Sequence, residues 1–273
     1  MSARVALTVA GSDPSGGAGV QADLKTFGAL DAFGTAVLTA LTAQSTRGVA
    51  GVHVVPAGFV HRQLEVLLED VQVHAAKTGM LADAAITRVV ADVLGAHPAP
   101  LVVDPVMVAT SGDRLLDESA VTAVREELVP VADLVTPNVP EAAVLLGTDP
   151  ARDVDGVAAQ AEELLRRTGT AVLLKGGHLG GAESVDVLAE PGGTHRLARP
   201  RLGTTSAHGT GCTLSAAIAA LAARGGGAPV SWLPVVQEAR DYLQGALAAA
   251  GALGVGSGAG PLDHFFAHHR EDP

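Results

Sequence analysis

Residues 4–33 read RVALTVAGSDPSGGAGVQADLKTFGALDAF, and this stretch decides the fold. Its first part, Arg4–Ala10, is a mostly apolar run with the length of a buried strand. A glycine-rich turn, Gly11–Gly19, follows, and apolar side chains then recur at helical spacing over Ala22–Phe33. The stretch therefore predicts a strand, a tight turn and a helix, which together open a βαβ unit.

The same alternation continues along the rest of the chain. Strands are expected at 35–43, 74–78, 101–104, 133–136 and 171–175, helices at 59–71, 83–94, 118–128, 140–146, 157–167, 213–223 and 233–249, and a β-ribbon at 184–190 and 194–199. Short strands that alternate with helices form a mostly parallel sheet with helices on both faces. Because no linker-like segment interrupts the pattern, we expect residues 1–273 to form one α/β domain, with a small β flap near residues 46–55.

Composition excludes several classes of protein. The net charge is −11 with histidine neutral, which argues against wide contact with nucleic acid because such contact rests on Lys and Arg. The sequence has no apolar run of the roughly 18 residues that cross a membrane and no leader-like start, so we expect a cytoplasmic protein without membrane contact. The single cysteine, Cys212, excludes an internal disulfide and a zinc site built on several cysteines.

Polar residues gather at the expected carboxyl ends of the strands, where open α/β sheets bind their ligands. The groups are Gly11–Gly19, Thr42–Ser45, Lys77–Met80, Asp104–Met107, Thr136–Glu141 and Lys175–His178. Each group alone is compatible with an ordinary turn. Six such groups at one edge of a sheet predict a binding site.

The segment HGTGCT, residues 208–213, precedes an apolar helix and is the strongest local signal. Backbone amides at a helix start bind anions, and glycine allows the close approach that a phosphoryl group in transfer needs. Cys212 is expected at that helix start, where the dipole would lower its thiol pKa and let the thiolate accept a proton. The alternatives are an inert buried cysteine and, for His208, a plain loop residue or a proton carrier. The sequence lacks Walker and protein-kinase motifs.

Three further residues offer hard oxygen donors on neighbouring strand ends, a set that suits Mg²⁺: Asp104, Asn138 and Glu141. The alternatives are a turn before Pro105 for Asp104 and a first-turn helix acid for Glu141. Lys175 ends an apolar strand, where an ammonium group needs an anionic partner such as a phosphate unless it reaches solvent.

Seven motifs occur in order along nearly the whole chain, from about Val5 to Phe266: AGSDPSGGAGVQADLKTF (10–27), TALTAQSTRGV (39–49), KTGML (77–81), VVDPVMVATSG (102–112), TPNVPEA (136–142), LLKGGH (173–178) and HGTGCTLSAAIAA (208–220). With these motifs the chain resembles the hydroxymethylpyrimidine/phosphomethylpyrimidine kinases of thiamine biosynthesis, in the ribokinase-like superfamily. The resemblance implies a ribokinase-like fold, a homodimer, and two phosphorylations at one site that use ATP and Mg²⁺. The first acts on the hydroxymethyl group of 4-amino-5-hydroxymethyl-2-methylpyrimidine and the second on the monophosphate.

The resemblance also implies a role for each group of residues. Gln44 would bind the ring nitrogen and exocyclic amine of the pyrimidine, and the residues bordering the same pocket would be Gly11, Asp23, Met80, Val106, Met107 and His208. ATP would be bound by Lys175, Asn138, Thr210 and Gly211, and Mg²⁺ would be bound, directly or through water, by Asp104, Asn138 and Glu141. The catalytic candidates are Lys175 and an anion hole of Gly209, Gly211 and Cys212. Much of the superfamily has Asp where this chain has Cys212.

Two other functions stay open. A pyridoxine/pyridoxal kinase, or an enzyme with both activities, would act on a similar flat nitrogen ring with a CH₂OH arm. Gln44 together with Met80 favours the pyrimidine. The other possibility is a non-catalytic nucleotide-binding or regulatory protein on the same fold. An intact set of Asp104, Glu141, Lys175 and Cys212 favours catalysis.

Overall fold

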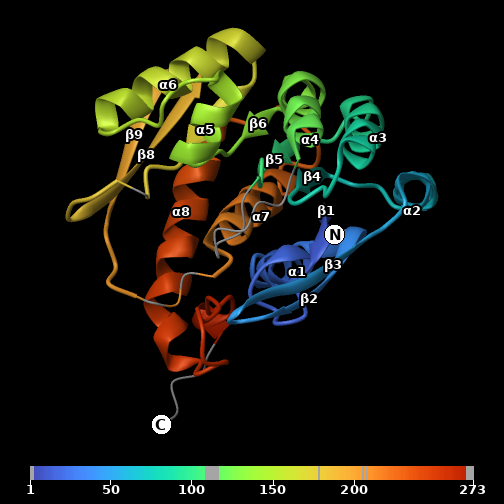
Figure 1. Ribbon diagram of the computed structural model, residues 1–273, viewed down its shortest axis with the longest axis horizontal. Coiled ribbons are helices and arrows are strands. Elements are labelled where there is room, and N and C mark those ends of the chain that lie inside the picture. Colours follow the sequence, from blue (N-terminus) through green and yellow to red (C-terminus); the bar gives the residue numbers. More distant parts are fainter. Residues whose placement is uncertain (1–2, 108–116, 178, 205, 207, 269–273) are drawn as a thin grey trace.

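A single sheet of nine strands forms the centre of the computed structural model, which describes residues 3–107, 117–177, 179–204, 206 and 208–268 (Figure 1). The strands are β1 (Val5–Ser12), β2 (Phe33–Ser45), β3 (Gly48–Val54), β4 (Ala75–Thr78), β5 (Leu101–Val103), β6 (Leu134–Val135), β7 (Ala171–Leu174), β8 (Glu183–Glu190) and β9 (Gly193–Pro200). They lie in the order β3-β2-β1-β4-β5-β6-β7-β8-β9. The neighbouring strands β2-β1-β4-β5-β6-β7 are parallel to one another. At one edge β3 is antiparallel to β2, and at the other edge β8 is antiparallel to β7 and β9 to β8. The expected mostly parallel α/β architecture is confirmed.

Helices cover both faces of this sheet (Figure 1). They are α1 (Gly19–Ala29), α2 (Ala57–Asp70), α3 (Ala84–Gly95), α4 (Glu118–Ala123), α5 (Val139–Leu146), α6 (Val154–Thr168), α7 (Thr210–Ala223) and α8 (Trp232–Ala249), with short helical turns η1 (Val124–Leu128), η2 (Val129–Val131), η3 (Ala250–Ala252) and η4 (Phe266–His268). One apolar core lies between the sheet and α2 to α6, and a second between the sheet and α1, α7 and α8. In β1, Leu7 belongs to the first core and Ala6 to the second, as the alternation of strand side chains requires.

Two helix boundaries differ from the sequence expectation. The helix expected over 22–33 ends at Ala29, because Asp31 has a left-handed φ of 60° and Phe33 already starts β2. The helix expected from residue 213 begins at Thr210, so the HGTGCT segment supplies its first turn. The expected flap near 46–55 is β3, which pairs with the end of β2.

Parallel strands place their carboxyl ends at one edge of the sheet, and the helices that follow begin there. The starts of α1 and α5 therefore lie near the ends of β1 and β6, and the start of α7, which follows β9, lies against the same edge beside the end of β7. A short bridge between Asn138 and Lys175 joins the end of β6 to the end of β7. Among the helices of the described residues, none has the length and apolar character that crossing a membrane requires.

Candidate active site

A cavity of about 440 Å³ lies at the carboxyl edge of the parallel strands. Thirteen of the expected site residues line it: Gly11, Gln44, Met80, Asp104, Val106, Asn138, Glu141, Lys175, His208, Gly209, Thr210, Gly211 and Cys212. A larger hollow of about 530 Å³ lies at the opposite edge, among residues 68–74, 97–99 and 226–227, and holds none of the expected residues. His178, the last member of its expected group, lies outside the described residues.

The backbone of the loop before α7 lies directly against the backbone of the loop before α1. Gly209 has a φ of 83°, in the left-handed region that glycine adopts without strain. A Cβ atom there would lie 1.8 Å from the carbonyl oxygen of Gly17, so only glycine lets this loop touch the loop before α1. A Cβ atom at Gly211 would lie 3.4 Å from Nζ of Lys175 and 3.5 Å from an oxygen of Asp104. The first turn of α7 therefore lies against two charged groups of the cavity.

Cys212 lies in the first turn of α7, half-buried in the cavity wall. Burial raises the pKa of its thiol to about 11. The Lys77 ammonium and a hydrogen bond from the Gly19 amide lower this pKa, but they do not offset burial and the nearby carboxylates of Asp23 and Asp104. The expectation of a lowered thiol pKa is therefore wrong, because the loss of solvent outweighs the helix dipole. In the free protein, Cys212 is a neutral thiol at neutral pH.

Lys175 and Asp104 form an ion pair on the cavity wall, with Nζ and Oδ1 2.9 Å apart. The Lys175 side chain is 15% exposed and the Asp104 side chain 2%. Burial lowers the pKa of Lys175, but the carboxylates of Asp104 and Glu141 outweigh burial and raise it above its usual value. Lys175 therefore stays protonated at neutral pH and offers a phosphate group a positively charged donor.

Glu141 and Asn138 form a capping box at the start of α5. The Asn138 N–H donates to Oε2 of Glu141 at 2.8 Å, and the Glu141 N–H donates to Oδ1 of Asn138 at 2.9 Å. Burial raises the pKa of the Glu141 carboxyl to about 7, although Lys175 opposes the rise. Glu141 thus lies in the first turn of a helix, as the alternative interpretation of the sequence expected, and it also lines the cavity. A bound cation would favour the carboxylate form of this side chain.

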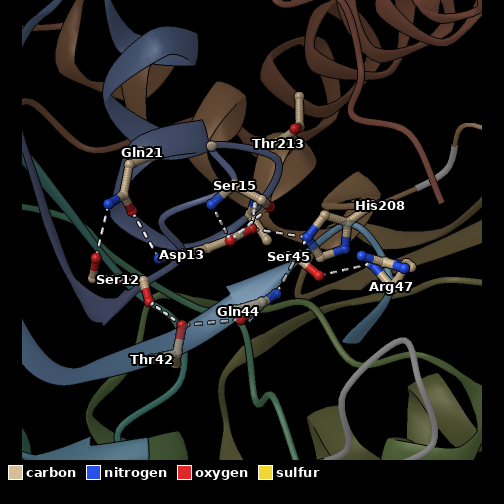
Figure 2. Close-up of polar contacts among 12 residues, drawn as sticks. Ser12, Asp13, Ser15, Gln21, Thr42, Gln44, Ser45, Arg47, His208 and Thr213 are labelled. Atoms are coloured by element: carbon tan, nitrogen blue, oxygen red, sulfur yellow. Dashed lines mark hydrogen bonds and ion pairs between the residues drawn. The ribbon is translucent and has the colours of Figure 1, made fainter. Parts of the chain in front are cut away.

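Asp13 and His208 join the loop after β1 to the loop before α7 (Figure 2). Oδ2 of Asp13 lies 2.8 Å from Nε2 of His208 and also accepts the Ala18 N–H at 2.9 Å. Oδ1 accepts both the N–H and the hydroxyl of Ser15. Burial raises the pKa of Asp13, but the hydrogen bonds from His208 and Ser15 outweigh it, so the pKa is lowered and Asp13 is a carboxylate.

Gln44 lies beside this pair, near the end of β2 (Figure 2). Its side-chain amide has His208 on one side, with the two Nε2 atoms 3.4 Å apart. On the other side, the Thr42 Oγ1 lies 3.1 Å from Oε1 of Gln44 and 2.8 Å from the carbonyl oxygen of Ser12. The amide expected to bind the pyrimidine is therefore flanked by two side chains, Thr42 of β2 and His208 of the loop before α7.

Two residues expected in the substrate pocket lie beneath the cavity. Asp23 of α1 is completely buried, and its carboxylate accepts Lys77 Nζ at 2.8 and 2.9 Å and the Thr8 hydroxyl at 2.6 Å. Met107 is buried in the apolar core under α2 to α6. The expectation for both is corrected. Val106 lines the cavity, and the adjacent Met107 packs into the core.

Sequence reasoning gave no role to several residues that support the site. Asp13 and Thr42 lie within motifs that were singled out, but nothing in a linear sequence links either to His208 or Gln44. A buried ion pair also supports the turn after Lys175: Arg240 Nε donates to Asp186 Oδ2 at 2.8 Å, and Asp186 Oδ1 accepts the Gly176 N–H at 2.9 Å. The signal of this pair in the sequence is Asp186 inside the otherwise apolar stretch 185–189, whereas Arg240 lies between the charged residues Glu238 and Asp241 and gives no such signal.

Comparison with known proteins agrees with this geometry. The family model described as phosphomethylpyrimidine kinase matches residues 13–263. The hydroxymethylpyrimidine/phosphomethylpyrimidine kinase of Escherichia coli is 49% identical over 263 residues, which cover 96% of this chain and 97% of that protein. The thiamine biosynthesis multifunctional protein of Corynebacterium efficiens is 50% identical over 261 residues, and the match spans 95% of this chain but only 35% of that protein.

Two solved structures show the shared fold. A phosphomethylpyrimidine kinase from Clostridium difficile has 38% identity and a TM-score of 0.76, over 88% of this chain and 97% of that one. The pyridoxal kinase from Staphylococcus aureus in complex with ADP has 32% identity and a TM-score of 0.89, over 99% of this chain and 96% of that one. The ribokinase-like fold expected from the motifs is thereby confirmed. With a family match that runs through both the Gln44 wall and the α7 loop, the chain belongs to the phosphomethylpyrimidine kinase family.

Proposed function

We propose that the protein transfers the γ-phosphoryl group of ATP to the hydroxymethyl group of 4-amino-5-hydroxymethyl-2-methylpyrimidine, and then phosphorylates the monophosphate, in thiamine biosynthesis. The observation that carries this proposal is one cavity lined both by the Gln44 amide and by the glycine-bounded start of α7 beside Lys175. Enzymes catalyse phosphoryl transfer mainly by positioning the reactants and neutralising charge. A ring site adjoining an anion site is the arrangement that such a transfer needs.

At the ring end, the Gln44 amide offers one acceptor and two donors to an aminopyrimidine edge. Met80 and Val106 supply apolar contacts to a flat ring. A Cβ atom at Gly11 would lie 2.5 Å from the terminal methyl carbon of Met80, so a side chain there would displace this methyl group from the wall. His208 lies at the same end, beside Gln44.

At the phosphate end, backbone amides of the first turn of α7, including those of Thr210 and Gly211, would stabilise the migrating phosphoryl group. Lys175 would neutralise ATP phosphates, and Asn138 lies beside it at the end of β6. Cys212 would take the proton from the substrate hydroxyl. Its raised pKa means that this step depends on nearby positive charge, such as that of Lys77, which favours the thiolate.

The residues present fit a Mg²⁺ ion. Asp104 and Glu141 supply carboxylate oxygens and Asn138 lines the same cavity, and Mg²⁺ prefers such hard oxygen donors. The raised pKa of Glu141 marks a buried carboxyl group that gains from a nearby cation. When bound, Mg²⁺ would neutralise charge on the β- and γ-phosphates.

Mass spectrometry of the products tests the proposal. The protein is incubated with the pyrimidine alcohol, ATP and Mg²⁺, and the monophosphate and diphosphate are followed in time. We expect the monophosphate first and the diphosphate later. Gln44→Ala should raise the KM for the pyrimidine without changing the KM for ATP. If no phosphorylated pyrimidine forms, the proposed function is wrong, and if Gln44→Ala weakens ATP instead, the ring site is misplaced.

A second substrate class has a specific observation in its favour. The chain superimposes on a pyridoxal kinase with a TM-score of 0.89, and pyridoxal also carries a CH₂OH arm on a flat nitrogen ring. We propose the pyrimidine as the main substrate because the pyrimidine kinase named above is 49% identical to this chain and the pyridoxal kinase only 32%. A comparison of kcat/KM for the two alcohols decides, and a large preference for pyridoxal would reverse the assignment.

We also infer that the protein forms a homodimer through the β2–β3 edge. Apolar side chains of Leu41, Val52 and Val54 are exposed there. Light scattering at micromolar concentration tests this, with Val52→Lys expected to shift the mass toward that of one chain.

A further inference from the structure

The hydrogen-bond partners of Gln44 carry an inference that rests on the proposed function and goes further. A glutamine amide reads a ring edge with one N–H and one C=O, so the order of these two groups decides which edge fits. The amide oxygen and nitrogen have nearly the same shape, and their partners therefore determine which is which.

The partner on one side is a donor. Asp13 is a carboxylate and can only accept, so the proton on the 2.8 Å contact belongs to Nε2 of His208. An Nε2–H that already points toward Asp13 cannot accept a hydrogen bond from Gln44, whose amide lies 3.4 Å away. The amide atom that suits this side is the oxygen.

The partner on the other side is an acceptor. Thr42 has one hydroxyl proton, and the Ser12 carbonyl oxygen, which can only accept, lies 2.8 Å from Oγ1. The remaining lone pairs of Oγ1 face the Gln44 amide at 3.1 Å. The amide atom that suits this side is the nitrogen. Both neighbours therefore favour the same orientation, which is turned over from the placement in Figure 2, where the amide nitrogen lies toward His208 and the oxygen toward Thr42.

We propose that Thr42 and the Asp13–His208 pair are positioning residues that hold the Gln44 amide with its nitrogen toward Thr42 and its oxygen toward His208. The cavity then selects a ring edge whose acceptor nitrogen lies on the Thr42 side and whose donor amine lies on the His208 side. A 4-aminopyrimidine has this edge. A 4-oxo pyrimidine, with N–H and C=O in the opposite order, would require the amide to turn over, against a donor at His208 and an acceptor at Thr42.

The test uses two pyrimidine alcohols that differ only in a 4-amino or a 4-oxo group. Calorimetry without ATP gives the dissociation constant of each for the whole protein. We expect the wild type to bind the amino compound ~100-fold or more tightly than the oxo compound. Thr42→Val keeps the shape of the side chain but removes its acceptor, and should lower this ratio about 10-fold. Thr42→Ser keeps the hydroxyl and should keep the ratio.

Turnover gives a second readout. In Thr42→Val, the KM for the amino compound should rise more than kcat falls, and the KM for ATP should stay constant, which a general loss of structure would not produce. Asp13→Asn, which removes the carboxylate that fixes the His208 proton, should also lower the amino/oxo ratio. An unchanged ratio in both variants would overturn the inference. If the wild type binds the amino compound but forms no phosphorylated product, the proposed function fails while the binding ratio still tests the inference.

Discussion

At the scale of single residues, Cys212 is subject to opposing influences. It begins a helix, lies within reach of the Lys77 ammonium and accepts a hydrogen bond from the Gly19 amide, all of which favour a thiolate. Burial and two carboxylates favour the thiol more strongly and raise the pKa to about 11. A base with so high a pKa is weakly ionised at neutral pH but strongly basic once ionised.

Cys212→Ala should therefore lower kcat by about 10² to 10⁴ and leave the KM for ATP unchanged. In the wild type, kcat/KM for the pyrimidine should rise with pH from 6.5 to 9, because the fraction of thiolate increases toward a pKa of about 11. The alanine variant should lose this rise. Steady-state rates across the range measure it, and equal slopes in both proteins would remove Cys212 from the proton transfer.

Glu141 has a pKa of about 7, which places its ionisation in the physiological range. Because only the carboxylate binds a cation, the apparent Mg²⁺ affinity should rise as pH increases from 6 to 8. Glu141→Gln keeps the shape of the side chain and should raise the Mg²⁺ requirement while flattening its pH dependence. Activity titrated with Mg²⁺ at several pH values measures both effects, and an unaltered titration would place Glu141 outside the metal site.

At the scale of elements, the site depends on contacts between the starts of helices. Gly209 and Gly227 both have a left-handed φ, of 83° and 86°. A Cβ atom at Gly209 would collide with Gly17, whereas a Cβ atom at Gly227 would meet nothing within 4 Å in the described part of the chain. Alanine substitutions at these two glycines therefore distinguish the effect of backbone strain from the effect of a steric clash at the cavity.

Gly209→Ala should lower kcat/KM by about 100-fold, because the loop before α7 must move away from the loop before α1. Gly227→Ala carries a similar strain of about 1 kcal/mol, far from the cavity, and should leave kinetics near those of the wild type. Thermal unfolding and steady-state kinetics of both variants check this. Equal kinetic losses would show that strain alone explains the effect.

The buried ion pair of Lys77 and Asp23 joins β4 to α1 beneath the cavity, and both side chains are 0% exposed. Lys77→Met should lower the free energy of unfolding by about 3–5 kcal/mol, because Asp23 is left buried without its cation. Urea unfolding measures this. Arg62→Ala, which breaks the exposed Arg62–Glu65 pair on α2, is the control and should change the midpoint little. Equal effects would show that burial does not decide the strength of these pairs.

Helices and strands were predicted correctly from the sequence where the apolar pattern extends over many residues. The predicted boundaries were wrong where contacts with distant segments end an element early. The helix pattern over 22–33 continued through Phe33, yet the left-handed Asp31 ends the helix early so that β2 can begin. The position of Asp23 was misjudged for a related reason. Its motif lies near the cavity, but the helix turns the carboxylate inward to Lys77, and that partner lies 54 positions away in the chain.

At the scale of the whole molecule, the C-terminal segment ties distant parts together. His208 pairs with Pro261 in a short bridge, and the Gly258 N–H donates to the Thr46 hydroxyl at 3.2 Å. His264 is buried behind α7, with Nε2 3.1 Å from the hydroxyl of Thr213. Burial lowers the pKa of His264 to about 4.

The low pKa of His264 makes global stability depend on pH. The unfolded chain takes up a proton at this histidine near pH 6.5 and the folded chain only near pH 4, so stability is full above 6.5 and falls as pH decreases through this window. Between pH 7.5 and 5 the loss should be about 2 kcal/mol. His264→Gln should reduce the fall by that amount in urea unfolding. An identical fall in the variant would assign the pH dependence to other groups.

The order of strands across the sheet shows what sequence could not supply. Alternation and strand length predicted the parallel class, and six polar strand ends predicted a common edge. That β1 lies between β2 and β4, with β3 and β8–β9 at opposite edges, depends on pairings between distant segments. The contacts of Gln44 with Thr42 and His208 likewise exist only once these segments are assembled.

One closing contact of the cavity joins Asp13 to His208, which are 195 positions apart in the chain. During synthesis, the wall that faces the heterocycle emerges from the ribosome long before the wall that cradles the anion. A nascent chain that stops short of the loop before α7 therefore lacks His208, Gly209 and Gly211, which complete the lining of the cavity. The cavity is therefore complete only after α7 has been synthesised and has packed against the loop that follows β1.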